Sequence, residues 1–134
     1  MKKITSFLCF LILAVVSALY FNSCRTVKDI PEDLTAPQLL QRGQSFYDAA
    51  DYKTAEAYFL ATLDRYGDNT DTYIEAKYEL AHLYIKTKNY DKARAALEEV
   101  LEIYDYAPAG SLPAAYKKLA QIEMEKIPNR SVEE

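Results

Sequence analysis

The sequence has little of the chemistry that most often builds metal sites, disulfides and tight turns. Its 134 residues include one histidine, two cysteines, three glycines, five prolines and no tryptophan. One imidazole and two thiols are too few for a structural zinc site. The scarcity of glycine and proline argues against an all-β fold, in which turns are frequent. The 16 Lys and Arg are outnumbered by 20 Asp and Glu, so a net charge of −4 leaves no basic excess for nucleic-acid binding.

The sequence also lacks the patterns of a catalytic or cofactor site. It has no phosphate-binding loop, no dinucleotide-binding glycine fingerprint and no metal-ligand spacing. His82 has no nucleophile and orienting group at a spacing that would form a catalytic set, so we interpret it as a partly buried hydrogen-bonding residue or a binding contact. An enzyme would have to use carboxylates and tyrosines alone. We therefore predict a non-enzymatic protein without a metal or cofactor.

At its N-terminus the sequence has the pattern of an export signal. Lys2 and Lys3 precede an uncharged, apolar run over residues 4–21. A positive end followed by an apolar segment is typical of such signals. At 18 residues the run is long for a cleaved signal and short for a membrane-spanning helix, which needs about 20 residues.

The residues at the end of this run resemble the lipobox of bacterial lipoproteins. The sequence there is Phe21-Asn22-Ser23-Cys24. Ser23 and Cys24 match the pattern. Phe21 is an apolar substitute, and Asn22 departs from it. The resemblance implies a signal peptide over residues 1–23, a lipid on Cys24, and a membrane-anchored location in the bacterial envelope, facing the periplasm.

Two other interpretations of the segment stay open. An ordinary signal peptidase could cleave after the Val-Ser-Ala of residues 16–18, or the apolar run could stay uncut as an anchor. All three place the rest of the chain outside the cytoplasm. Residues 24–36 are predicted to be the lipidated cysteine and a polar linker, and residues 128–134 a polar tail.

Between linker and tail, residues 37–127 are predicted to form one all-α domain. No proline occurs between Pro37 and Pro108, and apolar residues recur there at helical spacing. Asp51 is expected to cap a helix that begins at Tyr52, and Asn89 is expected to cap a helix that begins near Tyr90. The other expected boundary signals are Gly67 in a left-handed position, a Thr72–Glu75 capping box, Ser111 as the last N-cap and Pro128 as the final stop.

The helical pattern repeats with a period of 38 residues. A third start follows at Leu119–Ala120 and has no second helix. Small residues let helices approach closely, and large residues fill the space between them. The paired positions are Gly43 and Ala81, Phe46 and Tyr84, Tyr52 and Tyr90, Ala55 and Ala93, and Phe59 and Leu97.

This succession of small, aromatic and bulky residues resembles the tetratricopeptide repeat, a helix–turn–helix unit of 34 residues. The resemblance covers residues 37–127, as units over 37–67, 71–106 and 111–127, although the family's tryptophan is absent. It implies a short α-solenoid of about five helices. An unrelated small helical bundle is the alternative.

One segment of the first unit resembles the repeats of particular envelope proteins. Tyr52–Phe59 has the pattern Tyr-x-x-Ala-x-x-x-Phe and is followed by Tyr66 and Gly67. The pattern is similar to repeats in the lipoprotein of the outer-membrane β-barrel assembly machine and in the Tol–Pal cell-division coordinator. The resemblance implies a role in outer-membrane or envelope assembly.

In this family the first helix of each unit lines a concave groove. A mixed aromatic and polar groove suits an extended peptide or a partner helix. Alternatively, Tyr47, Tyr78 and Met124 merely complete the packing between units. The expected groove residues are Leu40, Gln44 and Tyr47 in the first unit, Tyr78, His82 and Ile85 in the second, and Lys117, Gln121 and Met124 in the last helix.

The function implied is that of a membrane-tethered adapter, which binds another envelope protein or peptide in its groove and the membrane through the lipid. A rival interpretation is a homo-oligomeric spacer that self-associates through Leu119, Ile122 and Ile127 on the last helix. The acidic residues that we interpret as solvated helix surface are Glu98, Glu99, Glu102 and Glu123.

Overall fold

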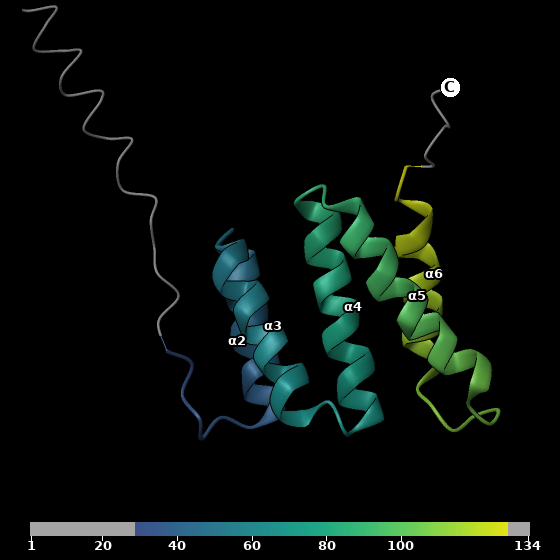
Figure 1. The fold of residues 1–134 in the computed structure, drawn as a ribbon, viewed down its shortest axis with the longest axis horizontal. Coiled ribbons are helices and arrows are strands. Elements are labelled where there is room, and N and C mark those ends of the chain that lie inside the picture. The colour runs from purple at the N-terminus through teal and green to yellow at the C-terminus, as the bar shows by residue number, and fades with distance from the viewer. Residues whose placement is uncertain (1–28, 129–134) are drawn as a thin grey trace, which may run out of the picture.

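The computed structural model describes residues 29–128, which form five helices and no strand. The all-α prediction is thereby confirmed. The predicted signal peptide, Cys24 and residues 129–134 of the tail lie outside the described residues. Within the described part, no helix combines the length and apolar character needed to cross a membrane. The helices are α2 (Ala36–Asp48), α3 (Tyr52–Tyr66), α4 (Thr70–Lys86), α5 (Tyr90–Tyr106) and α6 (Ala114–Glu125) (Figure 1).

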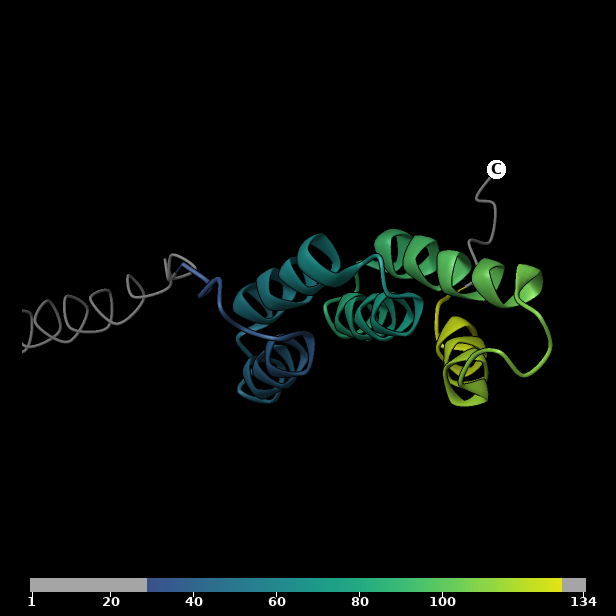
Figure 2. The same ribbon diagram turned by 90° about the horizontal axis from the view of Figure 1, so that it is seen from below.

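The helices lie in two layers. One layer contains α2, α4 and α6, and the other contains α3 and α5 (Figure 2). Each helix packs on the next one in the chain, and α4 also contacts both α2 and α6. Contacts that run only within a helix pair or between adjacent pairs are typical of stacked repeat units. The predicted short α-solenoid of helix pairs is therefore confirmed.

Small residues lie where the helices come closest. Gly43 on α2 is buried, and a Cβ atom added to it would lie 2.7 Å from Cδ1 of Phe59 on α3. Ala81 holds the corresponding position on α4 and is fully buried. Ala55 and Ala93 are fully buried in the second helix of each pair. The small and bulky residues of the repeat pattern therefore form the core between the helices.

Both helix pairs turn at a left-handed residue that is not glycine. These residues are Ala50, with φ 57°, and Lys88, with φ 61°, and they are one repeat period apart. The N–H of the next residue donates to the carbonyl five positions before it, at 2.9 Å after Ala50 and 2.7 Å after Lys88. This hydrogen bond is that of the Schellman motif. The same turn thus ends α2 and α4.

The predicted caps of the second helices are found at the expected residues. The side chain of Asp51 accepts a hydrogen bond from the N–H of Thr54 at 3.3 Å, so it caps α3 as predicted. Asn89 occupies the N-cap of α5, but its side chain makes no capping hydrogen bond there. The start of α5 therefore rests on its backbone geometry and packing.

The predicted boundary between α3 and α4 is wrong in two respects. Gly67 has φ −64° and is right-handed, so the chain reverses from α3 into α4 without a left-handed residue at the end of α3 (Figure 1). Asn69 is the N-cap of α4, and its side chain accepts from the N–H of Thr72 at 2.9 Å. The Thr72–Glu75 pair therefore lies inside the helix and does not cap it.

The predicted start of the last helix is also displaced. Ser111 is not its N-cap, since α6 begins at Ala114 directly after Pro113. The hydroxyl of Ser111 instead donates to the carbonyl of Pro108 at 2.7 Å and stabilises the loop before the helix. The helix ends at Glu125, before Pro128.

The chain before α2 is held against α3. The Arg65 guanidinium donates to the carbonyls of Pro31, at 2.6 Å, and Ile30, at 3.0 Å. The Tyr66 hydroxyl donates to the carbonyl of Leu34 at 2.8 Å, and Leu34 itself is buried. Residues 30–34 of the predicted linker are therefore fixed to the C-terminal end of α3.

Candidate partner-binding face

One side of the layer formed by α2, α4 and α6 is not covered by α3 or α5 (Figure 2). We call this side the inner face. In Figure 2, α4 is set back between α2 and α6 on this side, so the layer curves around α4. A segment that lies across the inner face would therefore meet side chains from all three helices.

A row of four rings crosses the inner face, and we call it the aromatic strip. Tyr47 of α2 and His82 of α4 have ring centroids 5.3 Å apart. His82 and Tyr78, one turn apart on α4, are 6.3 Å apart. Tyr78 in turn lies 5.6 Å from Tyr116 of α6, edge to face. These separations are typical of interacting aromatic pairs. The three tyrosines are half-buried, and the side chain of His82 retains 38% of its exposure.

Carboxylates lie beside the aromatic strip. Oε1 of Glu79 accepts a hydrogen bond from Nε2 of Gln44 at 2.9 Å, which links α4 to α2. Burial, and then the negative charge of Glu75 on α4, raise the pKa of the Tyr116 hydroxyl on α6. Burial raises the pKa of the Glu79 carboxyl above its ordinary value. The hydrogen bond at the edge of the strip therefore joins a neutral donor to an acidic residue.

A buried carboxylate lies next to the strip. Glu123 of α6 is 3% exposed, so its interpretation as solvated surface is wrong. Its Oε1 is 3.1 Å from Nδ1 of His82 and 2.7 Å from Nζ of Lys126. Its Oε2 is buried and has no hydrogen-bond partner among the described residues. The burial is possible because His82 and Lys126 contact one oxygen, as a buried carboxylate requires partners.

The electrostatic surroundings of the three strip tyrosines are negative. Burial raises the pKa of Tyr47, Tyr78 and Tyr116 above the ordinary tyrosine value. The next causes for Tyr78 are the negative charges of Glu123 and Glu79, and for Tyr116 the negative charge of Glu75. A cation placed at the strip would therefore be attracted, and an anion repelled.

The structure brings four of the nine predicted groove residues together. Tyr47, Tyr78 and His82 are members of the aromatic strip, and Gln44 contacts its acidic border. Leu40 is 5% exposed and belongs to the core, so it presents no binding surface. Ile85 is half-buried and packs against the core.

The three residues predicted on the last helix do not join the strip. Lys117 pairs with Asp105 at 3.5 Å, close to the end of α5. Met124 is half-buried against the core, and Gln121 is exposed and makes no polar contact with another residue of 29–128. The helix contributes Tyr116 and Glu123 instead. Two signals could have identified them: Tyr116 lies one repeat period after Tyr78, and Glu123 lies seven residues after Tyr116, which is two helical turns.

Comparison with known proteins decides the family. The tetratricopeptide repeat model matches residues 35–105, which is more than half of the chain. The chain belongs to the tetratricopeptide repeat family. An uncharacterized protein of Treponema pallidum (strain Nichols) is 32% identical to it over 117 residues. The match covers 85% of this chain and 47% of that protein, so the chain spans about half the length of this relative. No solved structure matches the chain.

The tetratricopeptide repeat assignment defines the position of each helix within the repeat units. α2 and α4 are the first helices of two units, and α3 and α5 are the second helices. α6 lies beyond the matched residues and occupies the position of a third first helix. The inner face is therefore the face that the first helices of the repeat units form.

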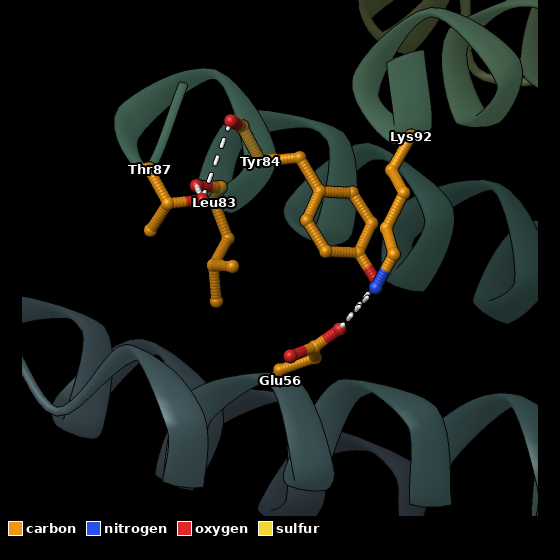
Figure 3. Close-up of polar contacts among 5 residues, drawn as sticks. All are labelled: Glu56, Leu83, Tyr84, Thr87 and Lys92. Atoms are coloured by element: carbon orange, nitrogen blue, oxygen red, sulfur yellow. Dashed lines mark hydrogen bonds and ion pairs between the residues drawn. The ribbon is translucent and has the colours of Figure 1, made fainter. Parts of the chain in front are cut away.

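Polar contacts fix the angle between the two tetratricopeptide repeat units. The Tyr84 hydroxyl donates to Oε1 of Glu56 at 2.6 Å, and Nζ of Lys92 is 3.4 Å from the same oxygen (Figure 3). Lys92 also lies 4.9 Å from the centroid of the Tyr84 ring. At the end of α4, the Thr87 hydroxyl donates to the carbonyl of Leu83 at 2.9 Å (Figure 3). These contacts connect α3, α4 and α5 and so help to set the curvature of the inner face.

A similar set of contacts links α4 to α5. Oε2 of Glu99 accepts from the Tyr73 hydroxyl at 2.7 Å and from Nζ of Lys77 at 2.6 Å. Glu99 was interpreted as part of a solvated surface, but it is half-buried and its Oε2 is contacted by two side chains of α4. Burial disfavours its charge, yet the hydrogen bonds from Lys77 and Tyr73 outweigh this and lower the pKa of the carboxyl.

A cavity of about 740 Å³ lies between the start of α4, the end of α5 and the loop before α6. Tyr73, Ile103 and Leu112 line it, and none of its lining residues belongs to the aromatic strip. Tyr106, which is 82% exposed, also lines it. The volume is within the range of small-ligand sites.

Among residues 29–128, no group of three or more His, Cys, Asp or Glu is placed to hold a metal ion.

Proposed function

We propose that this chain is a protein-interaction adapter that holds a segment of a partner protein on its inner face. The observation that carries the proposal is the aromatic strip, which runs without a break over α2, α4 and α6 of a tetratricopeptide repeat fold. Domains of this family are scaffolds for binding other proteins and are typically not enzymes. The 38% exposure of the His82 side chain leaves the middle of the strip accessible.

We propose further that the adapter is anchored in the bacterial cell envelope by a lipid on Cys24. The support is the sequence itself, with Lys2 and Lys3 before an apolar run that ends in Ser23 and Cys24. Because Ile30 is already held by Arg65, residues 24–29 would reach on the order of 20 Å at most. The domain would thus stay close to the membrane, where confinement makes weak contacts effective. Outer-membrane or envelope assembly is the process that we propose for it.

In-cell photo-crosslinking tests the adapter proposal. A benzophenone amino acid replaces Tyr78 or Gln44 on the inner face of the full chain, and Glu98, an exposed residue of α5, serves as the matched outer control. A discrete protein adduct from the inner positions alone is expected. Equal adducts from all three positions, or none, would overturn the proposal.

Metabolic labelling with an alkyne fatty acid tests the lipid. The full chain should incorporate the label, and Cys24→Ser should lose it together with the shift in electrophoretic mobility that signal cleavage produces. Unlabelled full chain that is shortened near residue 18 would indicate ordinary cleavage. Unlabelled chain of full length in the membrane fraction would indicate an uncut anchor.

A homo-oligomeric spacer is a second candidate function, favoured by one observation. Leu119 and Ile122 of α6 are 38% and 41% exposed, whereas Ile127 is buried against the core. A third unit's second helix would cover such residues, and α6 has none within residues 29–128. Crosslinks from Tyr78 or Gln44 to a second copy of this chain, together with a dimer mass by light scattering, would favour the spacer over the adapter.

A further inference from the structure

At three places in this domain a lysine lies over a tyrosine ring and pairs with a carboxylate. Two of them have the same arrangement, in which the tyrosine hydroxyl and the lysine contact one carboxylate oxygen. In the first, Tyr73 and Lys77 contact Glu99. In the second, Tyr84 and Lys92 contact Glu56.

In all three sets the lysine also lies against the tyrosine ring. The ammonium is 5.3 Å from the ring centroid of Tyr73, 4.9 Å from that of Tyr84 and 6.0 Å from that of Tyr104. In the last case the lysine is Lys117, which pairs with Asp105 next to the tyrosine. A ring face and a carboxylate attract the same cation, so each set is a complete cation site filled from within the chain.

On the inner face, the rings of Tyr116 and Tyr78 lie beside two carboxylates, those of Glu75 and Glu79. Burial, and then the charge of Glu75, raise the pKa of the Tyr116 hydroxyl. Glu79, one turn after Glu75 on α4, accepts a hydrogen bond from the neutral amide of Gln44. No ion pair with a lysine or arginine is found for Glu75 or Glu79 among residues 29–128. The lysines nearest in sequence, Lys77 and Lys117, are engaged with other carboxylates.

The surroundings of Tyr116 and Glu75 strengthen their preference for a cation. Tyr78 lies 5.6 Å from Tyr116 and offers a second ring. Glu123 lies next to the strip with one carboxylate oxygen buried and without a hydrogen-bond partner, while Lys126 contacts its other oxygen. In a half-buried position, water screens such charges less than at an open surface.

We propose that the partner segment bound on the inner face is basic, and that an arginine or lysine side chain of the partner lies against Tyr116 and Tyr78 and pairs with Glu75. The proposal rests on the adapter function and names the chemistry of its partner. The cation would complete on the inner face the arrangement that Lys77 and Lys92 complete elsewhere. Arginine fits best, because a planar guanidinium can stack on a ring and pair with a carboxylate at once.

The test uses the photo-crosslinked adduct of the full chain. Mass spectrometry of the adduct from the inner face should give a partner segment with an arginine or lysine within about one helical turn of the linked position. Glu75→Gln should lower the adduct yield about threefold to tenfold, the range expected for loss of one cation site. Glu98→Gln, the matched control on α5, should leave the yield unchanged.

A charge exchange separates a binding effect from a folding effect. Glu75→Lys should abolish the adduct, and changing the identified partner arginine to glutamate should restore it. Tyr116→Phe keeps the ring but not the hydroxyl and gives a second, milder variant, whose yield should fall less than that of Glu75→Gln. Circular dichroism melting of each variant in detergent should match the parent.

The possible failures are distinguishable. An adduct whose partner segment has no arginine or lysine, or whose yield is indifferent to Glu75→Gln, would overturn the basic partner and leave the adapter standing. No adduct from either inner position would overturn the adapter itself and the inference that depends on it.

Discussion

Nδ1 of His82 on α4 lies 3.1 Å from Oε1 of Glu123 on α6, and this contact ties the last helix to the middle of the inner face. Lys126, in the turn that follows α6, contacts the same oxygen at 2.7 Å. Ala120 and Ile127 supply buried apolar contacts on either side. Since α6 has no second helix of its own within the described residues, this buried carboxylate adds a polar tie to the apolar packing of α6 on α4 and α5.

The first prediction concerns Glu123→Ala. The substitution removes the shared partner of His82 and Lys126 and leaves a small cavity, so the free energy of unfolding should fall by about 1–3 kcal/mol. Amide hydrogen exchange should accelerate in α6 more than in α2 and α3, because only the last helix loses its tie. Urea unfolding and exchange mass spectrometry of the full chain in a non-ionic detergent measure both effects.

Glu125→Ala is the matched control for that experiment. Glu125 is exposed on the same helix, so its loss should change the free energy of unfolding by less than about 0.5 kcal/mol. Equal exchange in α6 of the parent and Glu123→Ala would show that the buried carboxylate does not hold the helix.

The second prediction concerns the two left-handed turns. Ala50 and Lys88 have φ values of 57° and 61°, a region that costs a residue with a Cβ atom about 1 kcal/mol relative to glycine. Ala50→Gly and Lys88→Gly should therefore each raise the free energy of unfolding by several tenths of a kcal/mol to about 1 kcal/mol. Thermal melting of each variant and of the double variant measures the gain.

Ala49→Gly tests whether the gain comes from the left-handed backbone. Ala49 precedes the turn with φ −78°, where glycine gives no relief and adds flexibility to the unfolded chain. This variant should be less stable than the parent. If Ala49→Gly and Ala50→Gly change stability in the same direction, the turn geometry is not the cause.

The third prediction concerns the close approach of α2 and α3. A Cβ atom at residue 43 would overlap the ring of Phe59, which is fully buried and has little room to move. Gly43→Ala should therefore destabilise the fold by about 1–3 kcal/mol, although alanine is the better helix former. Ser45→Ala, on the exposed side of the same helix, is the control and should be nearly neutral. A Gly43→Ala variant that melts above the parent would mean that the helices are not in contact at this residue.

The helix pairs were predictable because their signals are local. Gly43 and Ala81 recur at the repeat spacing, and Asp51 stands directly before its helix. The boundaries were less predictable, because more than one nearby residue can cap or end a helix: Asn69, and not Thr72, is the N-cap of α4. Gly67 suggested a left-handed turn, but it is right-handed, and the chain reverses into α4 without one.

The candidate site was predictable where it follows the repeat and not where it depends on the last helix. Tyr47, Tyr78 and His82 were found by counting along the first helices. Glu123 was misassigned because an acidic residue on a helix is usually solvated. Its partner His82 is 41 positions away in sequence, and no local pattern indicates that the two meet. Tyr116 joins the strip in place of Lys117, because it and not Lys117 lies one repeat period after Tyr78.

The last prediction concerns the pH dependence of the Glu99 contacts. The folded-state pKa of Glu99 lies below its ordinary value of 4.5, because the hydrogen bonds from Lys77 and Tyr73 outweigh the opposing effect of burial. A lowered folded-state pKa means that the ionised form stabilises the fold above the unfolded-state pKa, and that this contribution is lost as the pH falls through the folded-state value.

Glu99→Gln should therefore be less stable than the parent at about pH 7, and the difference should shrink as the pH falls below about 4.5. The effect should be small, since the Glu99 side chain is 45% exposed and solvent screens the pair. Urea unfolding across this pH range measures it, with Glu98→Gln as the exposed neighbour that should show no such trend. A Glu99→Gln deficit that stays constant down to about pH 3 would assign the loss to packing and not to the charge.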